Sequence, residues 1–75
     1  TMPEGDNLAE YFGNRENCFK DLGESRKAYS TRTTVEQFDN LLKGLRIMLL
    51  YCPEDIMYVV EAAIAETEFR QNYIR

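Results

Sequence analysis

A basic, hydroxyl-rich segment at residues 25–34, SRKAYSTRTT, has the residue types best suited to binding a ligand. It runs into a predicted helix start, where free N–H groups and the helix dipole attract anions and nearby arginines can grip phosphate. Tyr29 adds a ring on which a base could stack. The candidate residues for binding a phosphate, nucleotide or single strand are Arg26, Lys27, Tyr29, Arg32, Thr33 and Thr34. The favoured alternative is a solvated loop whose threonines only cap the next helix, because no glycine-rich phosphate loop or acidic ribose partner accompanies it.

Charge argues against a general nucleic-acid binder, because the net charge of the 75 residues is −4. A helix–turn–helix corner is predicted at residues 51–53, but the helix after it begins Pro-Glu-Asp and carries five acids and two bases. A recognition helix that approaches DNA phosphates should be neutral or basic near its N-terminus. The remaining nucleic-acid alternative is contact by a dimer through the basic segment 26–46, with Arg26, Lys27, Arg32, Lys43 and Arg46.

Catalysis finds little support among the residue types present. The chain has no histidine, which excludes a Ser–His or Cys–His nucleophile. The carboxylate pairs Glu54/Asp55 and Glu66/Glu68 are one and two residues apart, and helical side chains at those spacings point about 100° and 200° apart. Neither pair therefore converges on one site. We predict that the protein is not an enzyme, and we expect no cofactor.

The two cysteines, Cys18 and Cys52, stand among apolar and aromatic neighbours. That setting is typical of buried, reduced thiols inside the cell and not of a secreted disulfide scaffold. Apart from Lys20, no basic residue adjacent in sequence could depress the pKa of either thiol, so an activated thiolate is not expected. Scattered carboxylates and the lack of a Cys-x-x-Cys pair argue against a metal site.

The chain shows no membrane or export signal at the sequence level. Its longest apolar run, Ile47 to Cys52, is much shorter than the about 20 residues that span a bilayer. Residues 3–6 are acidic and turn-like, unlike a signal peptide, and Thr1 before Met2 suggests an expression remnant. We therefore expect a cytoplasmic protein without a membrane partner. Its predicted organisation is a disordered or expression-derived N-terminus at residues 1–5 and a single helical domain at residues 6–75.

Helix signals cover the N-terminal half of the domain. Asp6 can cap a short helix that ends near Gly13, and Asn14 can cap a second helix that runs to about Tyr29. The apolar side of this second helix is predicted from its spacing: Cys18, Phe19, Leu22 and Tyr29.

Two longer helices follow and meet at a proline. Thr33 and Thr34 each have a capping-box partner three residues later, so a helix begins after one of them. Pro53 ends it near Tyr51–Cys52 and opens a last helix to about Asn72. The fold class we predict is all-α: a small three-helix bundle, with or without a further short N-terminal helix, or a helical hairpin, assembled as an oligomer.

The last helix carries two apolar faces on a helical wheel. One is aliphatic: Ile56, Val60, Ala63, Ile64, Thr67 and Ile74. The other mixes aromatic with small residues: Tyr58, Ala62, Ala65, Phe69 and Tyr73. A core this small is marginal, so we favour covering the second face with another copy of the chain. A closed monomeric bundle and a surface for a different protein are the alternatives.

The predicted interface joins the end of one helix to the aromatic face of the next. Its residues are Ile47, Leu50, Tyr51, Tyr58, Ala62, Ala65, Phe69 and Tyr73. Tyrosine and phenylalanine are enriched in protein interfaces. The leading functional hypothesis is thus a small non-enzymatic regulator or adaptor, of the type found among bacterial or phage accessory proteins, which forms a homodimer and binds another protein. A nucleotide- or nucleic-acid-binding regulator using the basic segment 26–46 is the alternative.

Overall fold

The computed structural model describes residues 7–31 and 34–74 and is all-helical over them. Its four α-helices are α1 (Asn7–Phe12), α2 (Arg15–Ala28), α3 (Val35–Tyr51) and α4 (Met57–Ile74), and a 3₁₀ turn, η1 (Glu54–Ile56), leads into α4. No strand occurs in these two segments. The all-α prediction, with a short N-terminal helix before three longer ones, is confirmed. The predicted oligomer stays a prediction, and the predicted N-terminal segment 1–5 and the Asp6 cap lie outside the described residues.

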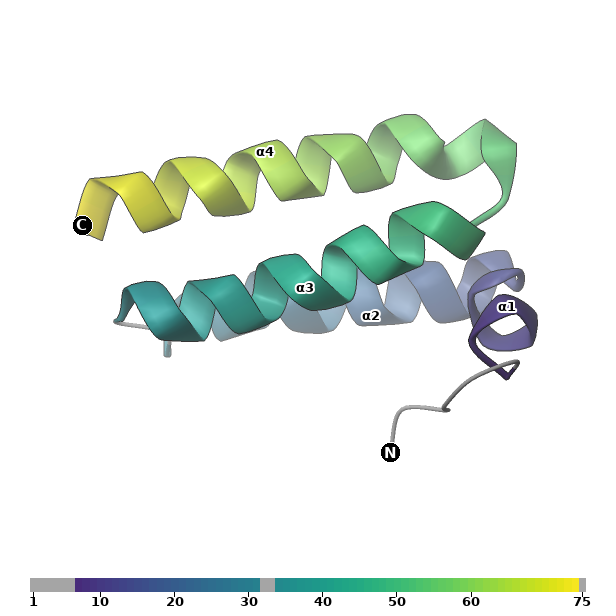
Figure 1. Cartoon of the computed structure of the whole chain (residues 1–75), viewed down its shortest axis with the longest axis horizontal. Helices are drawn as coiled ribbons and strands as arrows, with labels where there is room; N and C mark the ends of the chain where they lie inside the picture. Colours follow the sequence, from purple (N-terminus) through teal and green to yellow (C-terminus); the bar gives the residue numbers. More distant parts are fainter. Residues whose placement is uncertain (1–6, 32–33, 75) are drawn as a thin grey trace.

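The four helices pack as a bundle of three with a short helix across one end. Figure 1 shows α3 and α4 side by side and running in opposite directions, with α2 behind them and α1 at the end where α3 finishes. The molecule measures 34 × 24 × 17 Å. Because α4 packs at the outside of the three long helices, one long side of it faces away from α2 and α3 (Figure 1).

The helix starts follow local capping chemistry. Asn14 Oδ1 accepts a hydrogen bond from the backbone N–H of Glu16 at 2.9 Å, which satisfies one free donor at the start of α2. The capping box that begins α3 is the second of the two predicted alternatives. Thr34 Oγ1 accepts from the Gln37 N–H, and Gln37 Oε1 accepts from the Thr34 N–H, both at 3.2 Å. Thr33, the other predicted cap, lies outside the described residues.

The corner between α3 and α4 differs slightly from the prediction. Helix α3 ends at Tyr51, and Cys52 is extended with φ −69° and ψ 158°, as proline requires of the residue before it. Pro53 does not open an α-helix directly. It precedes the 3₁₀ turn η1, whose tighter geometry lets the chain reverse before α4 begins at Met57.

The buried apolar core draws on every helix of the described chain. One cluster joins side chains of α1, α2, α3, η1 and α4: Phe12, Cys18, Leu22, Leu45, Met48, Ile56 and Val60. Phe38 and Leu42 are also buried, on α3. The core face of α4 becomes polar toward its C-terminus, where Thr67 and Gln71 are buried. Gln71 is a core residue that the sequence analysis did not predict.

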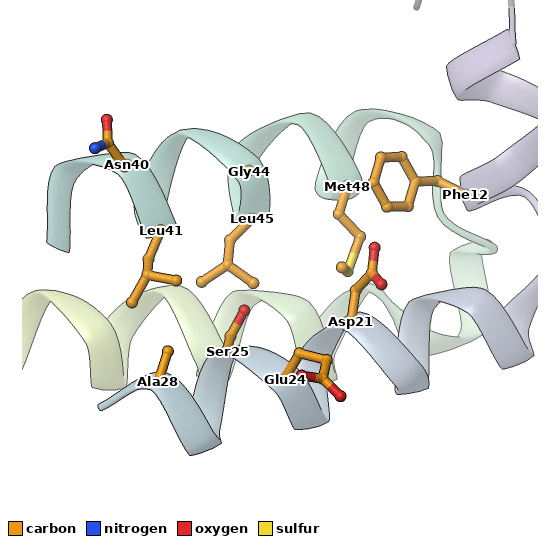
Figure 2. A pocket seen from close by; sticks show the side chains of 10 residues that line it. All are labelled: Phe12, Asp21, Glu24, Ser25, Ala28, Asn40, Leu41, Gly44, Leu45 and Met48. Atoms are coloured by element: carbon orange, nitrogen blue, oxygen red, sulfur yellow. The ribbon is translucent and has the colours of Figure 1, made fainter. Parts of the chain in front are cut away.

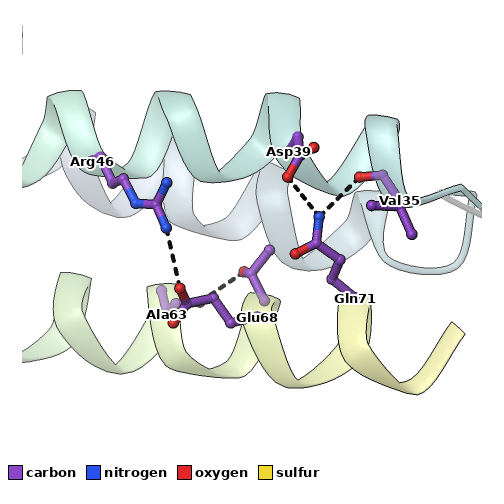
Figure 3. Close-up of polar contacts among 7 residues, drawn as sticks. Val35, Asp39, Arg46, Ala63, Glu68 and Gln71 are labelled. Carbon is purple, nitrogen blue, oxygen red and sulfur yellow. Dashed lines mark hydrogen bonds and ion pairs between the residues drawn. The ribbon is translucent and has the colours of Figure 1, made fainter. Parts of the chain in front are cut away.

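Polar contacts secure the C-terminal half of α4 to its neighbours. Gln71 Nε2 donates to the Val35 carbonyl at 2.9 Å and to Asp39 Oδ1 at 2.7 Å (Figure 3). Thr67 Oγ1 donates to the Ala63 carbonyl at 2.7 Å, and its oxygen lies 2.6 Å from the Tyr29 hydroxyl of the chain following α2. These bonds satisfy polar groups that would be costly to bury alone.

Candidate protein interface

Five of the predicted interface residues form a continuous exposed stripe on α4. We call this set the outer stripe: Tyr58, Ala62, Ala65, Phe69 and Tyr73. Its three aromatic side chains are 71%, 71% and 85% exposed in chain order. At about 100° per residue, the stripe points about 180° away from the buried side of α4. The helical wheel had separated an aliphatic face from an aromatic face, and in the single chain it is the aromatic face that is exposed.

The three interface residues predicted on α3 do not share one exposed face. Ile47 is partly buried and packs against the core cluster. Leu50 is 77% exposed and Tyr51 is 40% exposed. These two neighbours point about 100° apart, so they cannot both extend one face. Leu50 follows Arg46 by one turn and shares its side of α3.

Helix α2 borders the outer stripe on one side, and shallow hollows lie between them. One hollow of 350 Å³ is lined by Phe19 and Arg26 of α2 and by Ala62 and Glu66 of α4, among others. Phe19 was predicted to be on the apolar side of α2, but it is 46% exposed, because it points about 100° away from the buried Cys18. Phe19 thus extends the exposed apolar surface across to α2.

A second hollow lies toward the C-terminal end of the outer stripe. It has a volume of 410 Å³ and is lined by Phe69 and Tyr73 of the stripe, by Tyr29 and Phe38 beneath them, and by Arg70. Both hollows share Glu66, so they lie along the same edge of α4. The exposed aromatic rings of the outer stripe therefore lie beside surface hollows lined largely by apolar side chains.

Arginines pair with two acidic residues at the edges of the outer stripe. On the α2 side, Arg70 Nη2 lies 3.5 Å from Oε1 of Glu66, which comes four residues earlier in the same helix. On the α3 side, Arg46 Nη2 lies 3.1 Å from Glu68 Oε2, and this ion pair joins α3 to α4 (Figure 3). Glu68 is half-buried in this contact. Exposed pairs of this kind stabilise little, but they balance the local charge.

Two residues of the predicted anion site, Tyr29 and Thr34, make other contacts within the protein. Tyr29 is half-buried, with its hydroxyl at Thr67, the Arg70 guanidinium carbon 4.6 Å from its ring centroid, and Phe38 against it at 6.1 Å between centroids. Its ring is thus engaged inside the protein. The Thr34 hydroxyl is used in the α3 capping box.

Of the remaining predicted anion-site residues, Arg26 and Lys27 are exposed in the last turn of α2. Arg32 and Thr33 lie outside the described residues. Binding of a nucleotide or nucleic acid by the basic segment stays a prediction.

The two thiols are held in protonated form. Burial is the largest cause that raises the pKa of Cys18, and nearby Cys52 and Asp21 raise it further. Burial likewise raises the pKa of Cys52, against a hydrogen bond that lowers it. Both cysteines are free, and Cys18 Sγ donates to the Phe12 carbonyl at 3.0 Å. These are properties of structural thiols and not of nucleophiles.

A third surface hollow, of 350 Å³, lies between α2 and α3 (Figure 2). Asp21, Glu24 and Ser25 approach it from α2, over a floor that includes Leu45 and Met48. Its rim is acidic, and none of its lining residues is basic. No group of three histidine, cysteine, aspartate or glutamate side chains suited to a metal occurs in residues 7–31 and 34–74.

Comparison of the chain with protein-family models, with curated proteins and with solved structures found no match in any of the three. Within the part of the chain that the structure describes, no helix has both the length and the apolarity to span a bilayer.

Proposed function

We propose that the protein acts by binding another protein chain through the outer stripe of α4, as a non-enzymatic helical adaptor or regulator. The observation that carries this proposal is the exposure of Tyr58, Phe69 and Tyr73, each 71% or more, along one side of α4. An aromatic side chain carries about 150–250 Å² of surface, so the three together expose roughly 450 Å². Contiguous apolar surface of this size on a small domain marks an interaction site.

The shape of the surface supports a helical partner. The outer stripe spans about four turns of α4, with two alanines at its centre that allow close approach of another backbone. The hollows beside it offer room for side chains of the partner. An amphipathic helix laid into such a groove is a common mode of recognition, and its apolar residues would follow the same three- and four-residue spacing.

Site-specific photo-crosslinking tests this proposal. A photoreactive phenylalanine analogue replaces Phe69 in the stripe or, as a matched control, Lys43, which is exposed on α3. We expect the probe at Phe69 to form covalent adducts with protein, either a second copy or another chain, when the protein is expressed in its native cells. The probe at Lys43 should form few. Equal adduct yields at the two positions, or none at Phe69, would contradict the proposal.

A further inference from the structure

We infer that the chain covering the outer stripe is a second copy, packed so that the two α4 helices run antiparallel about a twofold axis beside Ala65. This inference rests on the proposed function and names its partner. It follows from the spacing of the stripe, the exposed area and the charges at its edges.

The spacing of the outer stripe is symmetric about its own midpoint. With the midpoint placed between Ala65 and Glu66, Ala62 and Phe69 lie equally far on either side, and so do Tyr58 and Tyr73. A twofold axis at that midpoint reverses the second helix and places Ala62 opposite Phe69 and Tyr58 opposite Tyr73, while Ala65 lies beside the axis, opposite Glu66.

The antiparallel arrangement also matches the sizes of the facing side chains. Phe69 of each copy lies opposite Ala62 of the other, so a large ring meets a small residue twice. A parallel pair would place Phe69 against Phe69 and leave the alanines facing each other. Alternating large and small residues fill an interface more completely, so the antiparallel pair packs better.

The available area is near what a stable dimer needs. Phe19 and the two alanines raise the exposed apolar surface to roughly 650 Å² per copy, and a standard interface buries about 800 Å² per partner. The Glu66–Arg70 pair at the α2 edge supplies polar rim around this apolar centre.

Charge permits the contact although each chain carries −4 overall. Arg70 pairs with Glu66 and Arg46 pairs with Glu68, so two acids beside the outer stripe are already balanced within each copy. In an antiparallel pair, the positive end of each helix dipole also lies beside the negative end of the other, which is favourable. A parallel pair would place like ends together.

The first experiment measures mass in solution by analytical ultracentrifugation at tens of micromolar. We expect the unmodified protein to have the mass of two chains. Ala62→Glu places a charge against the partner's Phe69 position at two symmetric points and should weaken the dimer roughly 100-fold or more. Asn40→Glu is the matched control, since Asn40 is exposed on α3 beside the hollow between α2 and α3, whose lining includes no residue of α4, and it should leave the dimer intact.

Helix content from circular dichroism shows whether each variant is folded. Should Ala62→Glu unfold the chain, Ala65→Glu serves as the second variant, since Ala65 is also exposed and lies beside the axis. A single-chain mass for the unmodified protein overturns the inference. So does a dimer that survives the folded stripe variant, or one that Asn40→Glu disrupts equally.

Disulfide trapping tests the helix direction. Ala65→Cys should crosslink to its own copy under mild oxidation, because both residues lie beside the axis. Asn72→Cys should not, because the two copies of residue 72 would be about 20 Å apart along the helices. The unmodified protein, with Cys18 and Cys52, measures background. Equal crosslinking at both positions would indicate a parallel pair and overturn the inference.

Failure of the inference and failure of the proposed function give different results. A single-chain mass together with Phe69 adducts to a different protein would exclude the second copy and leave the docking function standing. A single-chain mass with no Phe69 adducts would exclude both.

Discussion

Cys18 shows how a reactive residue type becomes a structural one. Its side chain is fully buried in the core cluster, and its Sγ donates to the carbonyl of Phe12, the last residue of α1. The thiol therefore fastens the end of α1 to α2. Burial disfavours its charged form, so the pKa of Cys18 is raised.

A pH dependence of stability follows from this raised pKa. The unfolded chain loses the Cys18 proton near its ordinary pKa of about 8.5, whereas the folded chain retains it to higher pH. The folded state then binds more protons, so stability is full below about pH 8.5 and falls as the pH rises toward the folded pKa. Each such thiol contributes a slope of up to about 1.4 kcal/mol per pH unit.

Urea unfolding at pH 7, 8.5 and 9.5 checks this expectation. The free energy of unfolding should fall between pH 8.5 and 9.5, and Cys18→Ala should make that fall smaller, whatever it costs at pH 7. Identical slopes for the two proteins would show that Cys18 does not cause the pH dependence.

At the scale of the helices, the boundaries depend on local chemistry that the sequence carries. Gly13 terminates α1, and its N–H donates to the Ala9 carbonyl at 2.9 Å. A Cβ at residue 13 would lie 2.7 Å from that same carbonyl oxygen, a backbone atom that cannot move aside freely. Gly23, in contrast, is exposed within α2, and a Cβ there meets nothing within 4 Å.

Alanine substitutions at these two glycines should have opposite effects. Gly13→Ala forces the α1–α2 corner to shift and should lower the free energy of unfolding by about 1–2 kcal/mol. Gly23→Ala restores helix propensity without a clash and should raise it by about 0.5–1 kcal/mol. Thermal and urea unfolding of both variants measure the difference. If both variants change the free energy of unfolding in the same direction, the roles assigned to Gly13 and Gly23 are wrong.

At the scale of the whole molecule, two kinds of contact hold α4 in place. Near its N-terminus, Ile56 and Val60 are buried in the apolar core. Near its C-terminus, Gln71 bonds to α3 and Thr67 bonds to Tyr29. The polar contacts specify how α4 lies against its neighbours, and they leave the aromatic side of the helix facing outward.

Removing the Gln71 amide should loosen the C-terminal half of α4. Gln71→Ala loses the bonds to the Val35 carbonyl and Asp39 and leaves a small void, so we expect a loss of about 1–3 kcal/mol in the free energy of unfolding. Asn72→Ala is the matched control, because Asn72 is exposed. Hydrogen exchange should accelerate in the last two turns of α4 for the first variant only. Uniform exchange in both would contradict this role.

The sequence by itself determined the helices and the exposed side of α4. Caps at Asn14 and Thr34, and the break at Pro53, are short-range signals that act on the residues beside them. The 3.6-residue period separates the outer stripe from the face that contains Val60. These features follow from neighbours along the chain, which is why they could be predicted.

Only the tertiary structure decided which surfaces meet. Tyr29 fitted a nucleotide site in the sequence, but it bonds to Thr67, 38 residues away, and lies against Phe38 and Arg70. Ile47 packs on the core, whereas Leu50 is exposed on the side of α3 that carries Arg46. The spacing of Val60, Thr67 and Gln71, seven and four residues apart, was the signal that could have placed Gln71 on the buried face. The relative orientation of helices depends on contacts between residues far apart in the sequence, and no local pattern encodes it.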